Sequence, residues 1–465
     1  MPDRTRIEKD SLGEVAVPAD ALYGAQTQRA VNNFQISHQP LPPTFIRAIA
    51  QIKQAAAKSN HELGLLSEEF ANAIARACDQ VIQGNFPGTW EQQFPVDIYQ
   101  TGSGTSSNMN VNEVITQLIK RKTHLDISAN DHVNMGQSSN DVIPSAIHVA
   151  ASEMVKHQLL PALDHLVKIL GLREQALSDI AKTGRTHLMD AMPVTFGQEI
   201  SGWKALVLQD RQRFGQCMER LNLLALGGTA VGTGTNTHRD FAHKVCEQLH
   251  QTTGIPFKPS DNFFAALSMP SAALELSATL KGLATTLTKI ANDLRWMNSG
   301  PLAGLGEIEL TALQPGSSIM PGKVNPVICE SVLMAAAQIT GFDTAITIGV
   351  QSSNFQLNTM LPMIGSNLIK GITLASNSCR SLADKALADF TVKQDHIDEA
   401  LYKNPILITA LNPVIGYMKA AEIAKQAYAE KRSVLDVAKE KTNLSEEELR
   451  KLLDPVLLTK GGLVK

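Results

Sequence analysis

Apolar residues recur at a helical period along most of the chain. Between Phe45 and Asn60 they stand three or four positions apart with alanines between them, which is the spacing of one helix face. The same period runs from Phe70 to Val81, and Gly84 is placed to end that helix. Strand-like alternation is rare and confined to about the first 35 residues. The pattern therefore predicts a mainly α protein.

Three further segments are long and poor in helix breakers. They run from Ile143 to Leu170, from Met269 to Asn298 and from Pro326 to Val350. Pro144 is tolerable in the first of them only near the start of a helix. Helices of this length favour a bundle, because alanine and glycine at the contacts let helix axes approach closely. Near the end of the chain, Ser445 to Glu448 has the spacing of a capping box before a short helix.

The simplest division of the chain is into three parts. We expect a small N-terminal domain over residues 1–135, a long central helical bundle over residues 136–392 and a small C-terminal helical domain over residues 393–465. A length of 465 residues agrees with about three domains.

The composition of the chain excludes two classes of protein. There are 42 Lys and Arg against 45 Asp and Glu, for a net charge of -3, which is not the basic character of a nucleic-acid-binding protein. Hydrophobic residues make up 43% of the chain, which excludes intrinsic disorder. Charged residues make up only 19%, below the roughly 25% of an average domain. The chain should therefore bury much of its surface, in a large interior or against other subunits.

The five cysteines are scattered singly, with no C-x-x-C pair; they are Cys78, Cys217, Cys246, Cys329 and Cys379. This spacing predicts neither a disulfide framework nor a zinc or iron–sulfur site, but buried reduced thiols.

No apolar run approaches the ~18 residues of a membrane span, and the charged N-terminus lacks the apolar segment of a signal peptide. We expect a cytoplasmic protein with no membrane partner.

Three segments rich in Gly, Ser, Thr and Asn interrupt the helical pattern. They cover Thr101–Asn108, Asn134–Asp141 and Gln314–Pro326, and each leads into a helix. Such loops direct unpaired backbone N–H groups and the positive helix end at an anion, and hydroxyl and amide side chains add donors. Ordinary helix capping would explain one such loop. Three long ones, one of which carries Lys323, favour a site for a polyanion.

Two other residues are candidates for acid–base chemistry. His187 lies between helical segments with polar neighbours on both sides, and Glu330 falls just inside the helix that follows the lysine loop. A lone histidine is more often structural, and an acidic residue in a first turn favours the helix dipole. From the residues alone, both the structural and the functional interpretation stay open.

The segment Gly316–Pro326 resembles the signature of the fumarase/aspartase superfamily. Other segments resemble those of class II fumarases, in family order and over nearly the whole chain; they are Leu22–Ala30, Thr101–Glu113, Gln137–Asp141, Gly184–Gln198, Gly227–His238 and Leu411–Pro413. Two details resemble fumarases more than aspartases. His187 follows Thr186 where aspartases usually place Gln, and Gly322 precedes Lys323 where aspartases tend to Ala.

The resemblance implies reversible hydration of fumarate to (S)-malate by anti addition of water. It makes Ser317 the base that takes the carbon proton, His187 the group that handles the hydroxyl proton through a water, and Glu330 the carboxylate that orients the imidazole. The residues that it assigns to the substrate are Ser103, Gly104, Thr105, Ser138, Ser139, Asn140, Thr186, Ser318, Lys323, Val324 and Asn325. Among these, Lys323 and Asn325 would stabilise the aci-carboxylate.

The resemblance also implies the assembly and its ligands. No metal or organic cofactor is expected, since the reaction moves only protons and hydroxide. The partners would be a small dicarboxylate and three further copies of the chain, in a homotetramer whose active sites are shared between subunits. No nucleic acid or membrane is expected to bind.

One segment departs from the family pattern. Many class II fumarases have a second anion site in a His-Pro-Asn-Asp turn, and here the corresponding residues are Ser128, Ala129, Asn130 and Asp131. The histidine is missing unless His124 or His132 substitutes for it. The primary site should be unaffected.

Other functions stay open at this point. Aspartate ammonia-lyase is the nearest alternative within the superfamily, and dependence of turnover on ammonia would separate it from a hydratase. Argininosuccinate and adenylosuccinate lyases fit the Thr186–Asp190 and Pro321–Pro326 segments less well. A non-catalytic helical scaffold is a different class, but it would not need Ser317, Lys323 and His187 together.

Overall fold

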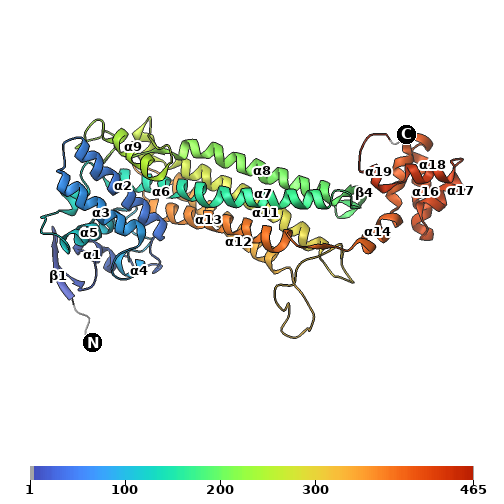
Figure 1. Ribbon diagram of the computed structural model, residues 1–465, viewed down its shortest axis with the longest axis horizontal. Helices are drawn as coiled ribbons and strands as arrows, with labels where there is room; N and C mark the ends of the chain where they lie inside the picture. Colours follow the sequence, from blue (N-terminus) through green and yellow to red (C-terminus); the bar gives the residue numbers. More distant parts are fainter. Residues whose placement is uncertain (1–4, 464–465) are drawn as a thin grey trace. The chain divides into compact units, whose positions relative to one another are not determined.

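The protein is mainly α-helical, as the sequence predicts. The computed structural model describes residues 5–463, and Figure 1 shows the order of its elements. The charged first four residues, on which the expectation of no signal peptide depends, lie outside the described part. The α-helices are α1 (Ala25–Asn33), α2 (Pro43–Glu62), α3 (Glu68–Gln83), α4 (Trp90–Gln93), α5 (Thr105–Lys120), α6 (Ser139–Met154), α7 (Leu160–Ala176), α8 (Phe196–Leu221), α9 (Phe241–Thr253), α10 (Phe263–Ser268), α11 (Ser271–Met297), α12 (Val327–Gln351), α13 (Leu361–Leu382), α14 (Gln394–Lys403), α15 (Asn412–Ile415), α16 (Tyr417–Glu430), α17 (Val434–Lys441), α18 (Glu446–Leu452) and α19 (Pro455–Leu458).

Shorter helical turns of other types join some of these helices. They are the π-helical turns η1 (Ala129–Val133), η2 (Val155–Leu159) and η3 (Ala383–Leu387) and the 3-10 helix η4 (Pro405–Leu411). The predicted helix from Ile143 to Leu170 is confirmed as α6, η2 and α7 in succession. Pro144 lies in the second turn of α6, close to the helix start as expected.

The strands form four separate pairs in the described part of the chain. They are β1 (Thr5–Asp10) with β2 (Gly13–Pro18), β3 (Ala181–Thr186) with β4 (Met189–Thr195), β5 (Leu223–Leu224) with β6 (Lys258–Pro259), and β7 (Ile308–Glu309) with β8 (Thr391–Val392). The expectation of strands only near the N-terminus was wrong, because β3 and β4 form a second antiparallel hairpin. The inner residues of β3 include Lys182, Thr183 and Gly184, so the strand lacks the hydrophobic alternation by which strands are recognised.

The described residues divide into two compact units. The first unit comprises the chain up to Pro161 with Asp210–Ala284 and Ala336–Ser376, and the second comprises Ala162–Gln209, Thr285–Ala335 and the chain from Asn377. These units combine segments that are distant in the sequence, whereas the predicted division cuts the sequence at residues 135 and 393. The three-part division therefore stays a prediction.

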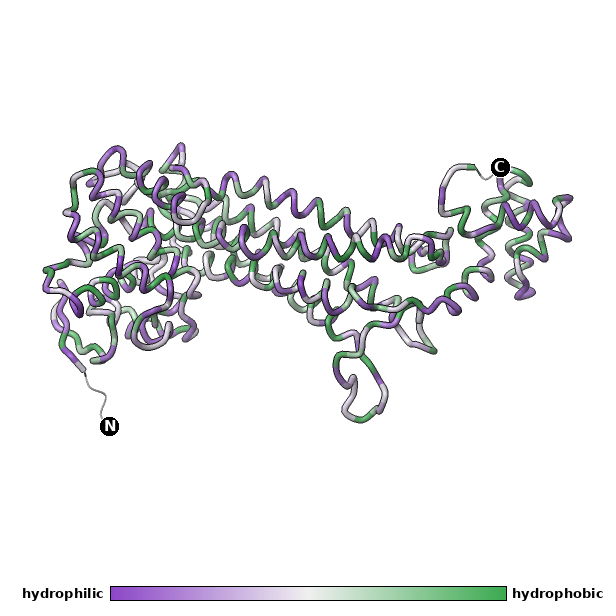
Figure 2. Tube along the Cα trace, viewed as in Figure 1, coloured by the Kyte–Doolittle hydropathy of each residue, from purple (hydrophilic) through white to green (hydrophobic). Residues whose placement is uncertain are grey.

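The helix ends follow the predicted capping signals. Gly84 ends α3 in the left-handed conformation, with φ of 72°, which a residue without Cβ adopts most readily. Ser445 caps α18, and the reciprocal bonds between Ser445 and Glu448 confirm the capping box. Along the helices, hydrophobic residues alternate with hydrophilic ones (Figure 2), as expected where one face of a helix is buried.

Small residues permit close helix contacts in the first unit. A Cβ built on Gly365 of α13 would lie 2.4 Å from the ring of Phe45 on α2 and 3.0 Å from Ile147 on α6. A Cβ on Gly371 would contact Leu280 of α11 at 3.5 Å. These contacts agree with the expectation that glycine lets the bundle helices approach closely.

All five cysteines are buried and none is in a disulfide, as the sequence predicts. Burial raises the pKa of the Cys217, Cys246 and Cys329 thiols to about 12. These thiols are therefore protonated at neutral pH and are poor nucleophiles and metal ligands.

Helix α12 is more apolar than the sequence analysis, which found no apolar run of membrane-spanning length, had indicated. By length and composition alone α12 could cross a membrane, with 33% of its most apolar window buried. One such helix is weak evidence for a membrane span, because the core helices of soluble proteins have the same composition. Met334 and Ile348 are 68% and 50% exposed on this helix, so α12 carries apolar surface open to another contact.

We predict that Gly365→Ala destabilises the protein although alanine favours helices. Overlap with the Phe45 ring should cost about 1–3 kcal/mol, whereas alanine gains at most ~1 kcal/mol over glycine in a helix. A lower Tm in thermal unfolding checks this. The matched control is Gly215→Ala on α8, where no atom lies within 4 Å of the added Cβ. A Tm of the Gly365 variant equal to or above that of the Gly215 variant would contradict the packing argument.

Candidate active site

The first of the three polar loops leads into α5 in the first unit. Gly104 precedes the helix in the left-handed conformation, with φ of 75°, and a Cβ there would lie 2.8 Å from Ile143. A Cβ on Gly102 would lie 1.9 Å from the carbonyl oxygen of Thr359. The hydroxyls of Ser103 and Thr105 are 2.8 Å apart. Glycine is thus required at both positions because neighbouring atoms lie too close for a side chain. The loop that they form places the hydroxyls of Ser103 and Thr105 at the N-terminus of α5.

The second loop leads into α6 in the same unit. Ser138 caps the helix, and its backbone N–H donates to Asp141 Oδ1 at 2.9 Å. Asp141 Oδ2 accepts from the backbone N–H groups of Gly227 and Thr229 at 3.0 and 2.9 Å. Burial raises the pKa of Asp141 to about 6, although these hydrogen bonds oppose the rise. The carboxylate therefore fixes the Ser138 loop to the Gly227 turn.

A direct hydrogen bond joins these two loops. Asn108 Nδ2 on α5 donates to the Ser139 hydroxyl at 3.0 Å and to Asn134 Oδ1 at 3.2 Å. Asn140 Nδ2 donates to the carbonyl oxygen of Ala230 at 2.8 Å. The first unit thus links helix α5, which begins at Thr105, to the loop that carries Ser138–Asn140.

The third loop lies in the second unit and closes on itself ahead of α12. The N–H of Gly316 donates to the carbonyl oxygen of Lys323 at 2.8 Å, and Asn325 Nδ2 donates to the carbonyl oxygen of Gly316 at 2.5 Å. Ser317 Oγ accepts from the N–H groups of Ile319 and Met320 at 3.3 and 3.0 Å. The loop thus directs two donors at the oxygen of Ser317.

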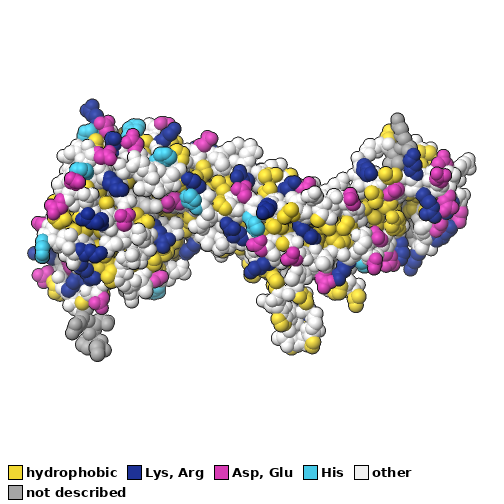
Figure 3. Space-filling view, in the orientation of Figure 1, with side chains coloured by type: hydrophobic (Ala, Val, Ile, Leu, Met, Phe, Trp, Pro, Cys, Tyr) yellow, Lys and Arg dark blue, Asp and Glu magenta, His cyan; other side chains and the backbone are white. Residues whose placement is uncertain are grey.

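The end of this loop and the start of α12 line a cavity of about 720 Å³ in the second unit. The predicted site residues in its wall are Lys323, Val324, Asn325 and Glu330. The side chains of Ser318, Lys323 and Val324 are exposed. Ser317 is not part of this wall. The loop also carries hydrophobic side chains on its surface (Figure 3).

His187 lies at the tip of the β3–β4 hairpin, which the sequence analysis missed. Thr186 pairs with Met189, so His187 and Leu188 form a two-residue turn with φ of 56° and 61°. Two positive φ values are those of a type I′ turn, which normally takes Asn or Gly. Thr186 and His187 are exposed. Among the described residues, no hydrogen bond joins His187 to Glu330.

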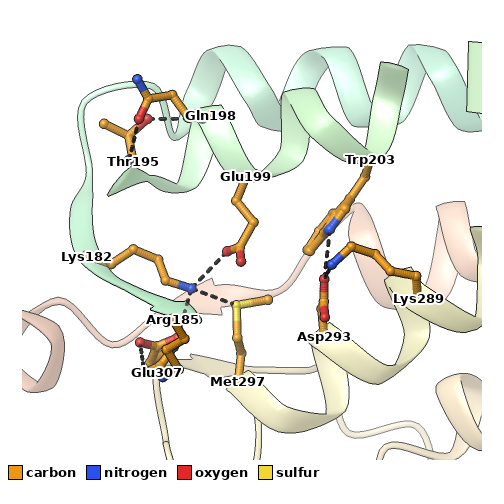
Figure 4. A network of polar contacts seen from close by, with 10 residues as sticks. All are labelled: Lys182, Arg185, Thr195, Gln198, Glu199, Trp203, Lys289, Asp293, Met297 and Glu307. Atoms are coloured by element: carbon orange, nitrogen blue, oxygen red, sulfur yellow. Dashed lines mark hydrogen bonds and ion pairs between the residues drawn. The ribbon is translucent and has the colours of Figure 1, made fainter. Parts of the chain in front are cut away.

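A buried ion-pair network holds the base of this hairpin (Figure 4). Lys182 Nζ lies 2.8 Å from Glu199 and 3.0 Å from Glu307, and Arg185 lies 2.5 Å from Glu307. Burial alone would raise the pKa of Glu307, but the charges of Arg185 and Lys182 hold it below its usual value. Strand β3, which ends at Thr186 directly before His187, is therefore fixed to α8 and to the segment that follows α11.

The Ser128 segment forms the turn η1. The Ser128 hydroxyl lies 2.8 Å from Asp131 Oδ2, and the Ser128 N–H donates to His132 Nδ1 at 2.9 Å. The His132 ring stacks on Phe70 at 4.4 Å. Ala129 and Asn130 line a cavity of about 270 Å³. The Nδ1 atom of His132 is thus occupied, and anion binding at Ser128 to Asp131 stays a prediction.

Sequence reasoning missed the residues that support the loops. These are Lys53, Asn134 and Asp141 in the first unit and Lys182, Arg185 and Glu307 in the second. Asn134 begins and Asp141 ends the second predicted loop, and the spacing of Ser138 and Asp141 is that of the capping box by which Asp141 could have been found. Lys53 stands in an Ala-rich helix without any local signal. The described part of the chain contains no group of three or more His, Cys, Asp or Glu that could hold a metal ion.

Comparisons with known proteins identify the family. Residues 13–341 match the family described as lyase, and residues 407–460 match the one described as fumarase C C-terminus. The chain is 56% identical to fumarate hydratase class II 2 of Pseudomonas aeruginosa over 99% of both chains, and 55% identical to fumarate hydratase class II of Xylella fastidiosa over 99% of this chain and 97% of the other. The crystal structure of recombinant class II fumarase from Schistosoma mansoni superimposes with a TM-score of 0.94 at 36% identity, over 98% of this chain and 99% of that one. This chain therefore belongs to the lyases, and within them to the class II fumarate hydratase family.

Proposed function

We propose that the protein catalyses the reversible hydration of fumarate to (S)-malate by anti addition of water. The observation that carries the proposal is the closed Gly316–Asn325 loop, which holds a serine oxygen under two backbone donors on the same loop as the exposed Lys323. Membership in the class II fumarate hydratase family supports the same reaction.

Ser317 is the base that removes the carbon proton in the malate direction. A serine hydroxyl is a weak base at neutral pH, so its alkoxide needs stabilisation. The N–H groups of Ile319 and Met320 point at Ser317 Oγ, and hydrogen bonds to the charged form favour that form. Lys323 adds a positive charge to the same loop.

Charge also grows on the substrate when the carbon proton leaves. The aci-carboxylate intermediate carries extra negative charge on a dianion, and fixed donors stabilise it without reorganisation. Lys323 and Asn325 fill this role. The remaining carboxylate contacts come from the hydroxyls, amides and helix N-termini of the other loops; these residues are Ser103, Gly104, Thr105, Ser138, Ser139, Asn140, Thr186, Ser318 and Val324.

His187 transfers the hydroxyl proton through a water, and Glu330 orients its imidazole. The exposed type I′ turn supports this role for His187, because backbone strain concentrates at functional sites. A hydrogen bond from His187 to Glu330 is not made within one chain, so Glu330 of another subunit would be the partner. This arrangement requires an oligomer.

We propose a homotetramer in which different subunits contribute loops to each site. Only 33% of the most apolar window of α12 is buried within one chain, which supports association, because a helix this apolar is normally covered. The five cysteines are buried and none forms a disulfide, which supports a reducing compartment, and we propose the cytoplasm. No cofactor takes part in the proposed reaction.

We expect purified protein to remove the ultraviolet absorbance of fumarate without ammonium and to form malate. The proposed groups move only protons and hydroxide, so ammonium should not change the rate. The assay is run with and without ammonium on the same preparation. Turnover that appears only with ammonium would instead establish an ammonia-lyase. A folded, assembled protein that acts under neither condition would favour the scaffold function.

We expect Ser317→Ala to lower kcat by about 10²- to 10⁴-fold, the usual contribution of a positioned base. The measurement is steady-state hydration of fumarate, with circular dichroism to verify folding. Ser445→Ala is the control, because it removes a serine that caps α18 and takes no part in the site. Equal kcat values for both variants would exclude Ser317 as the base.

We expect two inactive chains to restore activity when they assemble together. Ser317→Ala and Asn140→Ala chains are mixed, and tetramers that contain both are verified by mass. If each site takes these residues from different subunits, about a quarter of the sites in random tetramers carry both intact loops. Each variant alone, taken through the same mixing, is the control. Mixed tetramers as inactive as the two parents would rule out shared sites.

A further inference from the structure

Lys53 is a buried charge that the proposed mechanism does not use. It lies on α2 with none of its surface exposed, and its Nζ donates to Asn134 Oδ1 at 2.7 Å. Burial lowers the pKa of the Lys53 ammonium to about 7, and the nearby Asp141 on α6 and Cys78 on α3 oppose that fall. Burying a lysine is unfavourable unless its interactions compensate.

The ammonium fixes the orientation of Asn134. An ammonium can only donate, so the side-chain oxygen of Asn134 must face Lys53. The amide nitrogen of Asn134 then points the other way, and it donates to the carbonyl oxygen of Gln137 at 3.1 Å. If the side-chain amide of Asn134 were rotated so that its nitrogen and oxygen changed places, its N–H groups would face the ammonium, and neither group could accept a hydrogen bond from the other.

The orientation of Asn134 in turn fixes Asn108. The same Asn134 oxygen accepts from Asn108 Nδ2 at 3.2 Å and from Asn112 Nδ2 at 3.2 Å. The side-chain oxygens of Asn108 and Asn112 are left buried without a hydrogen-bond partner among the described residues. Such unpaired acceptors are costly, and the donor-only ammonium is what holds the two amides in this orientation.

The chain of contacts ends at the Ser139 hydroxyl. Asn108 Nδ2 donates to Ser139 Oγ at 3.0 Å, so the serine oxygen accepts from inside the protein. Its own proton is then free to be donated to an anion. If Asn108 turned over, its oxygen would face Ser139, and the hydroxyl would donate inward instead.

We propose that Lys53 is a positioning residue that directs the Ser139 hydroxyl proton toward a carboxylate of the substrate. Lys53 acts through Asn134 and Asn108 and touches no substrate itself. The inference rests on the proposed function, in which Ser139 binds the dicarboxylate.

The test is Lys53→Met, which keeps a buried chain of similar length and removes the ammonium. Losing one donor to a charged carboxylate should weaken binding roughly tenfold to a hundredfold. We expect KM for fumarate, measured below pH 7 where Lys53 keeps its proton, to rise by this factor, with a much smaller change in kcat. Below pH 7, where the ammonium keeps its proton, Tm should not fall, because the variant no longer buries a charge.

Gln54→Met is the matched control. Gln54 is the next residue on the same helix and is also buried, but it donates to the Ala75 carbonyl oxygen at 3.1 Å and to Asp79 at 2.7 Å, away from the polar loops. This variant should lower Tm and leave KM unchanged. A Lys53→Met variant that lowers Tm and leaves KM unchanged, as Gln54→Met should, would overturn the proposal.

A double-mutant cycle tests the link from Lys53 to Ser139. Ser139→Ala removes the same donor, so adding Lys53→Met to it should raise KM little further. Independent, multiplying effects would overturn the proposal. Asn134→Leu removes the intermediate amide and should give the same KM shift, so it replaces Lys53→Met if that variant does not assemble.

Calorimetric binding of succinate separates this inference from the proposed function. Succinate is a dicarboxylate without a double bond, so it binds without being hydrated. We expect its Kd to rise by the same roughly tenfold to hundredfold in Lys53→Met. An active wild type with unchanged succinate binding in the variant would overturn the Lys53 inference alone. A wild type that binds succinate without hydrating fumarate would overturn the proposed function, and the Kd of the variant would still test Lys53.

Discussion

A buried carboxylate needs hydrogen-bond or ion-pair partners, and this constraint positions the candidate loops in both units. In the first unit Asp141 accepts three backbone N–H groups from two segments that are far apart in the sequence. In the second unit Glu307 is paired with Lys182 and Arg185 at the base of the His187 hairpin. An isolated buried carboxylate would be protonated or would destabilise the fold. The loops are therefore held by the same bonds that make these charges tolerable.

Hydrophobic period and capping signals were sufficient to predict most of the fold. The segments Phe45–Asn60 and Phe70–Val81 correspond to α2 and α3, because the residues that form each helix face are local in the sequence. The β3–β4 hairpin was not predicted. Its buried face includes Lys182, whose partners Glu199 and Glu307 come from other elements. A strand held by long-range ion pairs leaves no hydrophobic alternation to detect.

The candidate site was predicted to the extent that its residues follow from local backbone chemistry. An added Cβ would lie less than 3.0 Å from another segment at Gly102 and Gly104, and less than 3.0 Å from the far side of the same loop at Gly316. The glycine-rich pattern therefore indicates close approach of backbones. The sequence did not predict which of the loops contact one another. The bond from Asn108 to Ser139 joins α5 to the start of α6, and nothing in either segment alone indicates the other.

Lys53 illustrates why supporting residues escape such analysis. In a sequence, a lysine among alanines in a helix is the mark of a solvated face, whereas here the side chain is fully buried. Its location is unfavourable for stability in itself, since an apolar side chain of the same length would fit without a desolvation penalty. Local rules fail most often at functional sites, where stability is given up for a specific arrangement of donors. A buried cation that sets the direction of a series of hydrogen bonds is such an arrangement. A group that can only donate forces each neighbour in the series to accept on one side and donate on the other.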